Sequence, residues 1–197
     1  MSRRFLRSGI GVSLVSLLFG ISGTVVPARA EVQKVLFVCL KGKAKEICPQ
    51  FRASFKPPDG WVEDKIAGAR QGRVVWVPKG RSFDNAPNVL SALVQIDKQK
   101  VPLSTFESRE IDAFKQKFAN AVQTQLPAIA NPRLGGTVKV AKLTAPTRKP
   151  RPIQLIAQFV DKDADDSPFV VQLTLDAQTE AALAEARPKF DAMIKTY

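Results

Sequence analysis

The chain has 197 residues and a formal net charge of +12 at pH 7, from 30 lysines and arginines against 18 acidic residues. It contains no histidine, which excludes serine–histidine and cysteine–histidine nucleophilic pairs and most zinc sites. The length suits one domain with a single core.

Residues 1–30 have the three parts of a secretory signal peptide. A basic start (MSRRFLRSG) precedes an apolar stretch at residues 9–22, which is too short to span a membrane. The sequence PARA at residues 27–30 supplies a small–x–small site, and we expect cleavage after Ala30. The spacing after the arginines favours general secretion over the twin-arginine route. An uncut N-terminal anchor is the alternative to cleavage.

The exported domain, residues 31–197, keeps a net charge of +8, because residues 1–30 carry four arginines and no acids. We expect it to be periplasmic or secreted, without a membrane span after cleavage and without nucleic acid as a partner. Its basic surplus suits an anionic envelope component, such as lipid headgroups or cell-wall polymer, or an acidic protein. The alternative is a soluble surface with surplus lysine.

Two cysteines, Cys39 and Cys48, lie in one short stretch, LFVCLKGKAKEICPQF. In an oxidising compartment an even number of cysteines indicates a disulfide, here closing a short loop with Gly42 at its turn. The alternatives are a catalytic thiol or a metal-binding pair. The absence of histidine as base or ligand favours the disulfide. It would contribute roughly 2–3 kcal/mol in the loop-entropy model.

The first two expected strands cover residues 34–40 and 50–56. Pro57-Pro58 ends the second strand, because proline cannot donate a hydrogen bond to a strand ladder. Asp59-Gly60 supplies a turn, after which Trp61 begins the return. We interpret Pro58, Gly60 and Trp61 as a structural corner that the fold needs, with a ligand-binding lip as the alternative.

Extended segments are expected at residues 61–66, 73–77 and 89–98, with an ordered loop at residues 78–88. The periodicity then changes. Ser104-Thr105-Phe106-Glu107 has the form of a helix capping box, and apolar residues follow at three- and four-residue steps. The pattern predicts an amphipathic helix over residues 105–126.

Three further strands are expected at residues 137–143, 152–160 and 168–176, and the loop 145–152 joins the first two. The polar sequence DKDADDS predicts a hairpin tip between the last two. A helical pattern covers residues 179–197. Pro188 within it indicates either a kinked helix or two short helices.

Two kinds of charged cluster are candidate binding residues. Asp161, Asp163, Asp165 and Asp166 match the first half of a calcium loop, but the turn glycine and the bidentate glutamate are missing. A solvated hairpin tip explains them, and weak calcium binding is the alternative. Possible anion-binding residues lie in the expected loops, namely Lys41, Lys43, Lys45, Lys79, Arg81, Arg148, Lys149 and Arg151. The alternative is that these charges are scattered and solvated.

The order of elements predicts an α+β fold with an antiparallel sheet covered by two amphipathic helices. The residues Phe55, Pro58, Gly60 and Trp61 at the corner, and Phe190 and Ile194 in the last helix, resemble the PsbP-like α/β/α sandwich over residues 51–197. That superfamily includes the oxygen-evolving accessory proteins of photosystem II, the DcrB-type bacterial lipoproteins and a Ran-binding nuclear import factor. The Cys39–Cys48 segment is an addition to the usual pattern, and the lipidated cysteine of the DcrB type is missing. Members share a fold rather than an activity, so the resemblance carries over no functional residue.

The resemblance implies a non-enzymatic accessory or binding module that needs no cofactor. A small histidine-independent hydrolase or lyase is the first alternative. It would need a buried carboxylate or lysine in a cleft, such as Asp64 or Glu63 beside Trp76. A calcium-stabilised structural protein is the second alternative, and it depends on the aspartate cluster.

Overall fold

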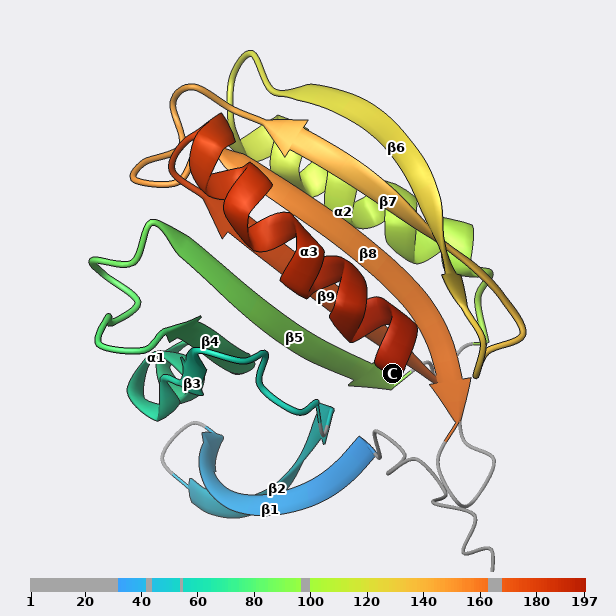
Figure 1. Cartoon of the computed structure of the whole chain (residues 1–197). Coiled ribbons are helices and arrows are strands. Elements are labelled where there is room, and N and C mark those ends of the chain that lie inside the picture. The colour runs from blue at the N-terminus through green and yellow to red at the C-terminus, as the bar shows by residue number, and fades with distance from the viewer. Residues whose placement is uncertain (1–31, 42–43, 54, 97–99, 163–167) are drawn as a thin grey trace, which may run out of the picture.

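The fold is built on a seven-stranded antiparallel sheet (Figure 1). The computed structural model describes residues 32–41, 44–53, 55–96, 100–162 and 168–197. The strand order in the sheet is β3-β4-β5-β9-β8-β7-β6. These strands are β3 (Trp61–Glu63), β4 (Val74–Pro78), β5 (Asn88–Ile96), β6 (Val122–Asn131), β7 (Gly136–Thr144), β8 (Ile153–Lys162) and β9 (Pro168–Ala177). A separate hairpin pairs β1 (Val32–Lys41) with β2 (Ala44–Ala53).

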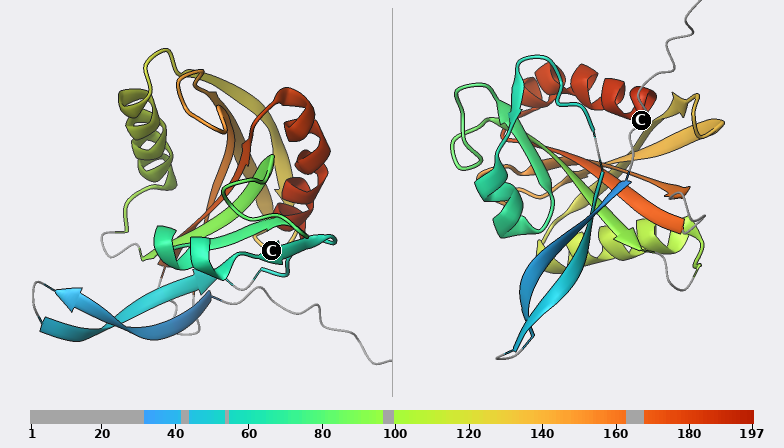
Figure 2. Two further views of the ribbon diagram at one scale, coloured as in Figure 1. Left: turned by 90° about the vertical axis from the view of Figure 1, so that its left-hand side faces the viewer. Right: turned by 90° about the horizontal axis from the view of Figure 1, so that it is seen from below.

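Helices cover both faces of the sheet. The described residues form the helices α1 (Lys65–Gln71), α2 (Leu103–Lys117) and α3 (Glu180–Thr196), and Figure 2 shows α2 and α3 on opposite sides. Successive residues of a strand point to opposite faces. In β8, Leu155 accordingly joins the core that contains Phe190 of α3, whereas Ile156 packs with Phe114 of α2. The α+β class with an antiparallel sheet is therefore confirmed.

The two faces contribute unequally to the core. The cluster on the α3 face is the larger and includes Trp76, Leu90, Val140, Leu155, Leu173, Leu175, Phe190 and Ile194. The cluster under α2 is smaller and consists of Phe114, Ala141, Leu143, Ala145 and Ile156. Because burial of one large apolar side chain stabilises by about 1.5–3 kcal/mol, most of the hydrophobic stabilisation lies on the α3 face.

The helix predicted over residues 105–126 is confirmed only as far as Lys117, and the prediction is wrong beyond that residue. α2 ends at Lys117, and Phe118 already has extended dihedral angles of φ −122° and ψ 111°. Asn120 has φ 60°, in the left-handed region that often follows a helix end. The chain from Val122 onward forms β6 and pairs with β7. The ladder hydrogen bonds with β7 thus override the helical spacing of the apolar residues.

β6 lies at one edge of the sheet. Its pairing with β7 is interrupted by a register shift between Leu126 and Ile129. Pro127 stands inside this interruption, where a residue without a backbone N–H is tolerated.

Residues 61–66 do not form one extended segment. β3 stops at Glu63, and Asp64 caps α1, because its Oδ1 accepts a hydrogen bond from the backbone N–H of Ala67 at 2.9 Å. Gly72 ends the helix with φ 65°. Gly68 brings α1 close to the start of β4, since a Cβ atom there would lie 2.8 Å from the carbonyl oxygen of Arg73.

The hairpin of β1 and β2 includes much of the segment that was expected as a cysteine-closed loop. β2 begins at Ala44, six residues earlier than the strand expected at residues 50–56. The backbone register pairs Cys39 with Glu46 and Cys48 with Phe37. The side chains of both cysteines lie outside the described part of the structure, so the disulfide stays a prediction. Residues 1–30 also lie outside it, and the signal peptide stays a prediction as well.

The terminal pattern forms a single helix, with Pro188 inside α3. Thr179 caps it, because its Oγ1 accepts a hydrogen bond from the backbone N–H of Ala182 at 3.1 Å. Among the residues that the structure describes, no helix has the length and apolar character needed to cross a membrane.

Candidate functional site

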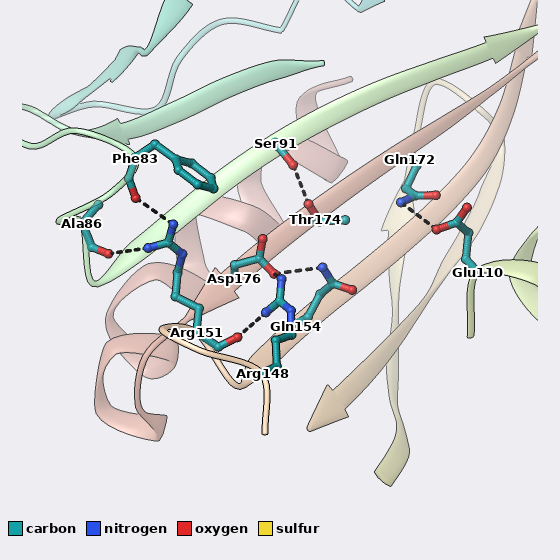
Figure 3. A network of polar contacts seen from close by, with 10 residues as sticks. All are labelled: Phe83, Ala86, Ser91, Glu110, Arg148, Arg151, Gln154, Gln172, Thr174 and Asp176. Carbon is teal, nitrogen blue, oxygen red and sulfur yellow. Dashed lines mark hydrogen bonds and ion pairs between the residues drawn. The ribbon is translucent and has the colours of Figure 1, made fainter. Parts of the chain in front are cut away.

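Two basic loops meet at the end of the sheet where β5 and β8 begin. The loop between β4 and β5 is joined to the loop between β7 and β8 by Arg151 (Figure 3). The Arg151 guanidinium donates hydrogen bonds to the carbonyl oxygens of Phe83 at 2.7 Å and Ala86 at 3.1 Å. It also lies over the Phe83 ring, 4.5 Å from the centroid. The contact therefore fixes the two loops side by side.

Arg151 is almost fully buried, with 4% of its surface exposed. Burial lowers the pKa of its guanidinium, although the nearby carboxylate of Asp176 opposes this effect. Its described hydrogen bonds are to carbonyl oxygens rather than to a carboxylate. Arg151 therefore brings a buried positive charge into the junction.

Arg148 is also used inside the protein. Its guanidinium pairs with Asp176 Oδ1 at 2.7 Å and donates a short hydrogen bond to the carbonyl oxygen of Arg151. Gln154 Nε2 donates to the same Asp176 oxygen at 2.8 Å. Side-chain exposure is only 19% for Arg148 and 13% for Asp176. The guanidinium groups of Arg148 and Arg151, named above as possible anion-binding residues, are therefore engaged within the protein, where they hold the loop in place.

Three of the possible anion-binding residues are exposed on the two loops that meet here. Lys79 and Arg81 belong to the loop after β4, and Lys149 belongs to the loop before β8. None of the three has an ion-pair partner within the described residues. We call Lys79, Arg81 and Lys149 the basic loop surface. Lys41 and Lys45 lie on the β1–β2 hairpin, and their side chains, like the whole of Lys43, lie outside the described part.

The corner at Pro58 is tied to the same end of the molecule. Gly60 has φ 79°, and the backbone N–H of Trp61 donates to the carbonyl oxygen of Pro58 at 2.9 Å. The backbone N–H of Lys79 then donates to the carbonyl oxygen of Gly60 at 2.8 Å. Trp61 is 8% exposed and belongs to the main core cluster. A hollow of about 380 Å³ lies between this corner and α3, lined in part by Pro57, Pro58 and Pro188.

A polar groove runs between α2 and the sheet, and no sequence pattern pointed to it. Two adjoining pockets of about 220 and 250 Å³ share Glu107, Lys139 and Gln158 in their walls. Glu107 and Lys139 form an ion pair at 3.7 Å. The groove exists because residues after Asn120 return as β6 instead of continuing α2. The sequence could not predict this groove, because the helix was expected to continue to residue 126.

The face of the central strand β9 toward α2 carries polar residues that hydrogen-bond to neighbouring elements (Figure 3). Thr174 is 1% exposed and contacts the Ser91 hydroxyl of β5 at 2.7 Å. Gln172 accepts a hydrogen bond from Gln158 at 2.7 Å and donates to Glu110 of α2 at 3.5 Å. These contacts satisfy buried polar groups and link α2 to the sheet.

The carboxylates proposed for a hydrolase or lyase have structural partners. Asp64 Oδ1 caps α1, and its Oδ2 accepts a hydrogen bond from the backbone N–H of Phe83 at 2.9 Å. These backbone hydrogen bonds, that of Ala67 first, lower the pKa of Asp64. Glu63 stands opposite Trp76 in the strand register and pairs with Arg52 at 2.6 Å.

Of the aspartate cluster, only Asp161 belongs to the described residues. Its carboxylate pairs with Arg133 and accepts a hydrogen bond from the Tyr197 hydroxyl at 2.9 Å. Asp163, Asp165 and Asp166 lie outside the described part. No group of three metal-ligating side chains occurs among the residues that the structure describes.

Comparison with known proteins assigns no family to the chain. No family model matches the sequence, and no curated protein matches it significantly.

Proposed function

We propose that the protein is an exported, non-enzymatic binding or assembly-accessory protein that engages an anionic envelope component or an acidic protein. The observation that carries this proposal is the junction made by Arg151. Two basic loops that are far apart in the sequence meet there, so that Lys79, Arg81 and Lys149 lie on adjoining segments.

The pairing of the charged side chains supports an anionic partner. Arg148 is neutralised by Asp176, and Arg70 pairs with Asp84 at 3.5 Å. The three cations of the basic loop surface have no such carboxylate among the described residues. An exposed cation without a partner can pair with a ligand at little desolvation cost, and several adjacent cations raise the association rate with an anionic surface.

The non-enzymatic part of the proposal draws support from the carboxylates. Asp64 and Glu63 already accept hydrogen bonds from α1, the β4–β5 loop and Arg52, which leaves their oxygens poorly placed to move a proton to or from a substrate. We also propose a PsbP-like arrangement. An antiparallel sheet with helices on both faces, and a Pro-Gly-Trp corner packed into the core, is compatible with it.

The test compares two variants with the same loss of charge. The first is Lys79→Ala/Arg81→Ala/Lys149→Ala, and the matched control is Lys115→Ala/Lys117→Ala/Lys195→Ala, which removes three exposed helical lysines. Both are assayed for co-sedimentation with anionic and zwitterionic phospholipid vesicles and for capture of envelope proteins, each at low and raised salt.

We expect wild type and control to bind anionic vesicles or an acidic envelope protein at low salt and to release them at raised salt. The first variant should lose this binding. Equal binding by both variants would reject the basic loop surface. Capture that is insensitive to salt would direct attention to an apolar surface instead.

A further inference from the structure

A small cationic pocket lies beside α1, separate from the basic loop surface. Its walls come from β2, β3, α1 and the residue before β4, and it has a volume of about 150 Å³. The lining residues are Arg52, Glu63, Lys65, Gly68, Ala69 and Arg73. Three of them are cationic, and one is anionic.

The charges of this pocket do not cancel. Glu63 is committed to Arg52 through the 2.6 Å ion pair. Lys65 and Arg73 have no ion-pair partner within the described residues, so the pocket carries an excess of about two positive charges. A phosphate monoester carries about −1.5 to −2 charges at pH 7, whereas a single carboxylate carries −1. The excess therefore matches a phosphate group better than a carboxylate.

The backbone around Arg73 is closely fixed. Its N–H donates to the carbonyl oxygen of Gly68 at 3.2 Å, and its own carbonyl oxygen lies only 2.8 Å from the position that a Cβ on Gly68 would take. The Nε atom of Arg73 is buried and has no hydrogen-bond partner among the described residues. Such a buried donor is uncommon in native proteins and is one of the signs of a site for a bound water or ion. Arg73 thus combines a fixed backbone with unused hydrogen-bonding capacity.

We propose that the pocket of Arg52, Lys65 and Arg73 binds a phosphate group, either free inorganic phosphate or a small phosphomonoester. The volume holds roughly five water molecules, and a phosphate group has five heavy atoms. Arg73 lines the pocket with a guanidinium, the planar group that can pair with two oxygens of a tetrahedral anion. Lys65 adds a point charge on a flexible side chain, and Arg52 is held at the wall by Glu63.

The experiment is calorimetric titration of the purified protein with inorganic phosphate, glycerol 3-phosphate and acetate at one fixed ionic strength. We expect saturable binding of one phosphate per chain, with acetate at least tenfold weaker. Tighter binding of glycerol 3-phosphate than of inorganic phosphate would identify a phosphomonoester as the ligand. The reverse order would identify free phosphate.

Two pocket variants and a matched control make the test specific. Arg73→Gln should weaken phosphate binding at least tenfold, and Lys65→Gln, at an exposed side chain, should weaken it about threefold or more. The control Arg81→Gln removes one charge from the basic loop surface and should leave phosphate binding unchanged. If Arg73→Gln fails to fold, Lys65→Gln decides the outcome alone.

Non-saturable binding, equal affinity for acetate, or an unchanged phosphate affinity of folded Lys65→Gln would overturn the proposal. This inference does not rest on the proposed function. Loss of vesicle or envelope binding in the basic-loop variant with phosphate binding intact would separate the two sites, as would the opposite result in the pocket variants.

Discussion

Alkaline pH should destabilise the folded protein through Tyr197, because the folded state keeps the proton that the unfolded chain releases. Tyr197 is the sole tyrosine of the chain and is 2% exposed. Its ring contacts those of Phe55 and Phe159, at centroid distances of 4.9 and 4.6 Å, and its hydroxyl donates to Asp161. Burial first, and then the charge and hydrogen bond of Asp161, raise the pKa of this hydroxyl far above its usual range.

The magnitude follows from linkage. The folded state holds the tyrosine proton, whereas the unfolded chain releases it near pH 10, so the stabilising contribution is complete below about pH 10 and is lost as the pH rises beyond it. At about pH 11, one unit above the unfolded pKa, the loss is about 1.4 kcal/mol. The free energy of unfolding should therefore fall as the pH rises above about 10.

The assay pairs two measurements across this pH range, phenolate absorbance and urea unfolding. Phenolate absorbance should appear only together with loss of near-ultraviolet circular dichroism. Tyr197→Phe should lose about 1 kcal/mol at neutral pH with its hydrogen bond, but its stability should fall less steeply in alkali. A phenolate titrating near pH 10 in a folded protein, or the same alkaline loss in Tyr197→Phe, would refute the reasoning.

The remaining predictions concern the loop junction and α1. Arg151→Met should cost about 2–4 kcal/mol in urea unfolding, because buried charge-assisted hydrogen bonds disappear, while Arg81→Met at an exposed position should change stability by less than about 0.5 kcal/mol. Asp64→Ala should cost about 1–2 kcal/mol at neutral pH. Because the folded pKa of Asp64 is lowered, this difference should shrink as the pH falls below about 4, and a gap that persists in acid would contradict its origin in the carboxylate. Gly68→Ala should cost about 1–3 kcal/mol by forcing α1 away from Arg73, whereas Gly136→Ala, which has open space, should be near neutral by thermal unfolding.

Local patterns predicted the elements that depend on their own residues. The strands at residues 34–40, 73–77, 89–98, 137–143, 152–160 and 168–176 and the terminal helix are confirmed to within a few residues. In the last five strands and the helix, apolar positions of the sequence lie among the buried residues. The Pro-Pro-Asp-Gly sequence likewise marked the turn before Trp61. The largest misses are the C-terminal end of α2 and the whole of α1. The prediction of a helix up to residue 126 did not consider that asparagine, here Asn120, readily adopts the left-handed conformation that ends helices. α1 was not predicted, although Asp64 is a typical N-cap residue and Gly72 a typical C-cap residue.

The candidate sites were less predictable. The sequence showed that residues 148–151 are basic, but not that Arg151 reaches carbonyl oxygens more than sixty positions earlier in the chain. The pocket beside α1 likewise combines Arg52 and Arg73 with a helix that no pattern predicted. Such sites depend on contacts between distant segments, which composition and periodicity do not encode.

The interrupted pairing of β6 has a consequence for association between molecules. An exposed strand edge can template the addition of a strand from another chain, a first step toward aggregation. Pro127 and the register shift beside it divide this edge, so no long uninterrupted row of backbone donors and acceptors faces a neighbouring molecule. The interruption of the edge therefore opposes self-assembly into continuous sheets. Val122 on the same strand is 61% exposed, and such an apolar side chain would favour self-assembly along an uninterrupted edge.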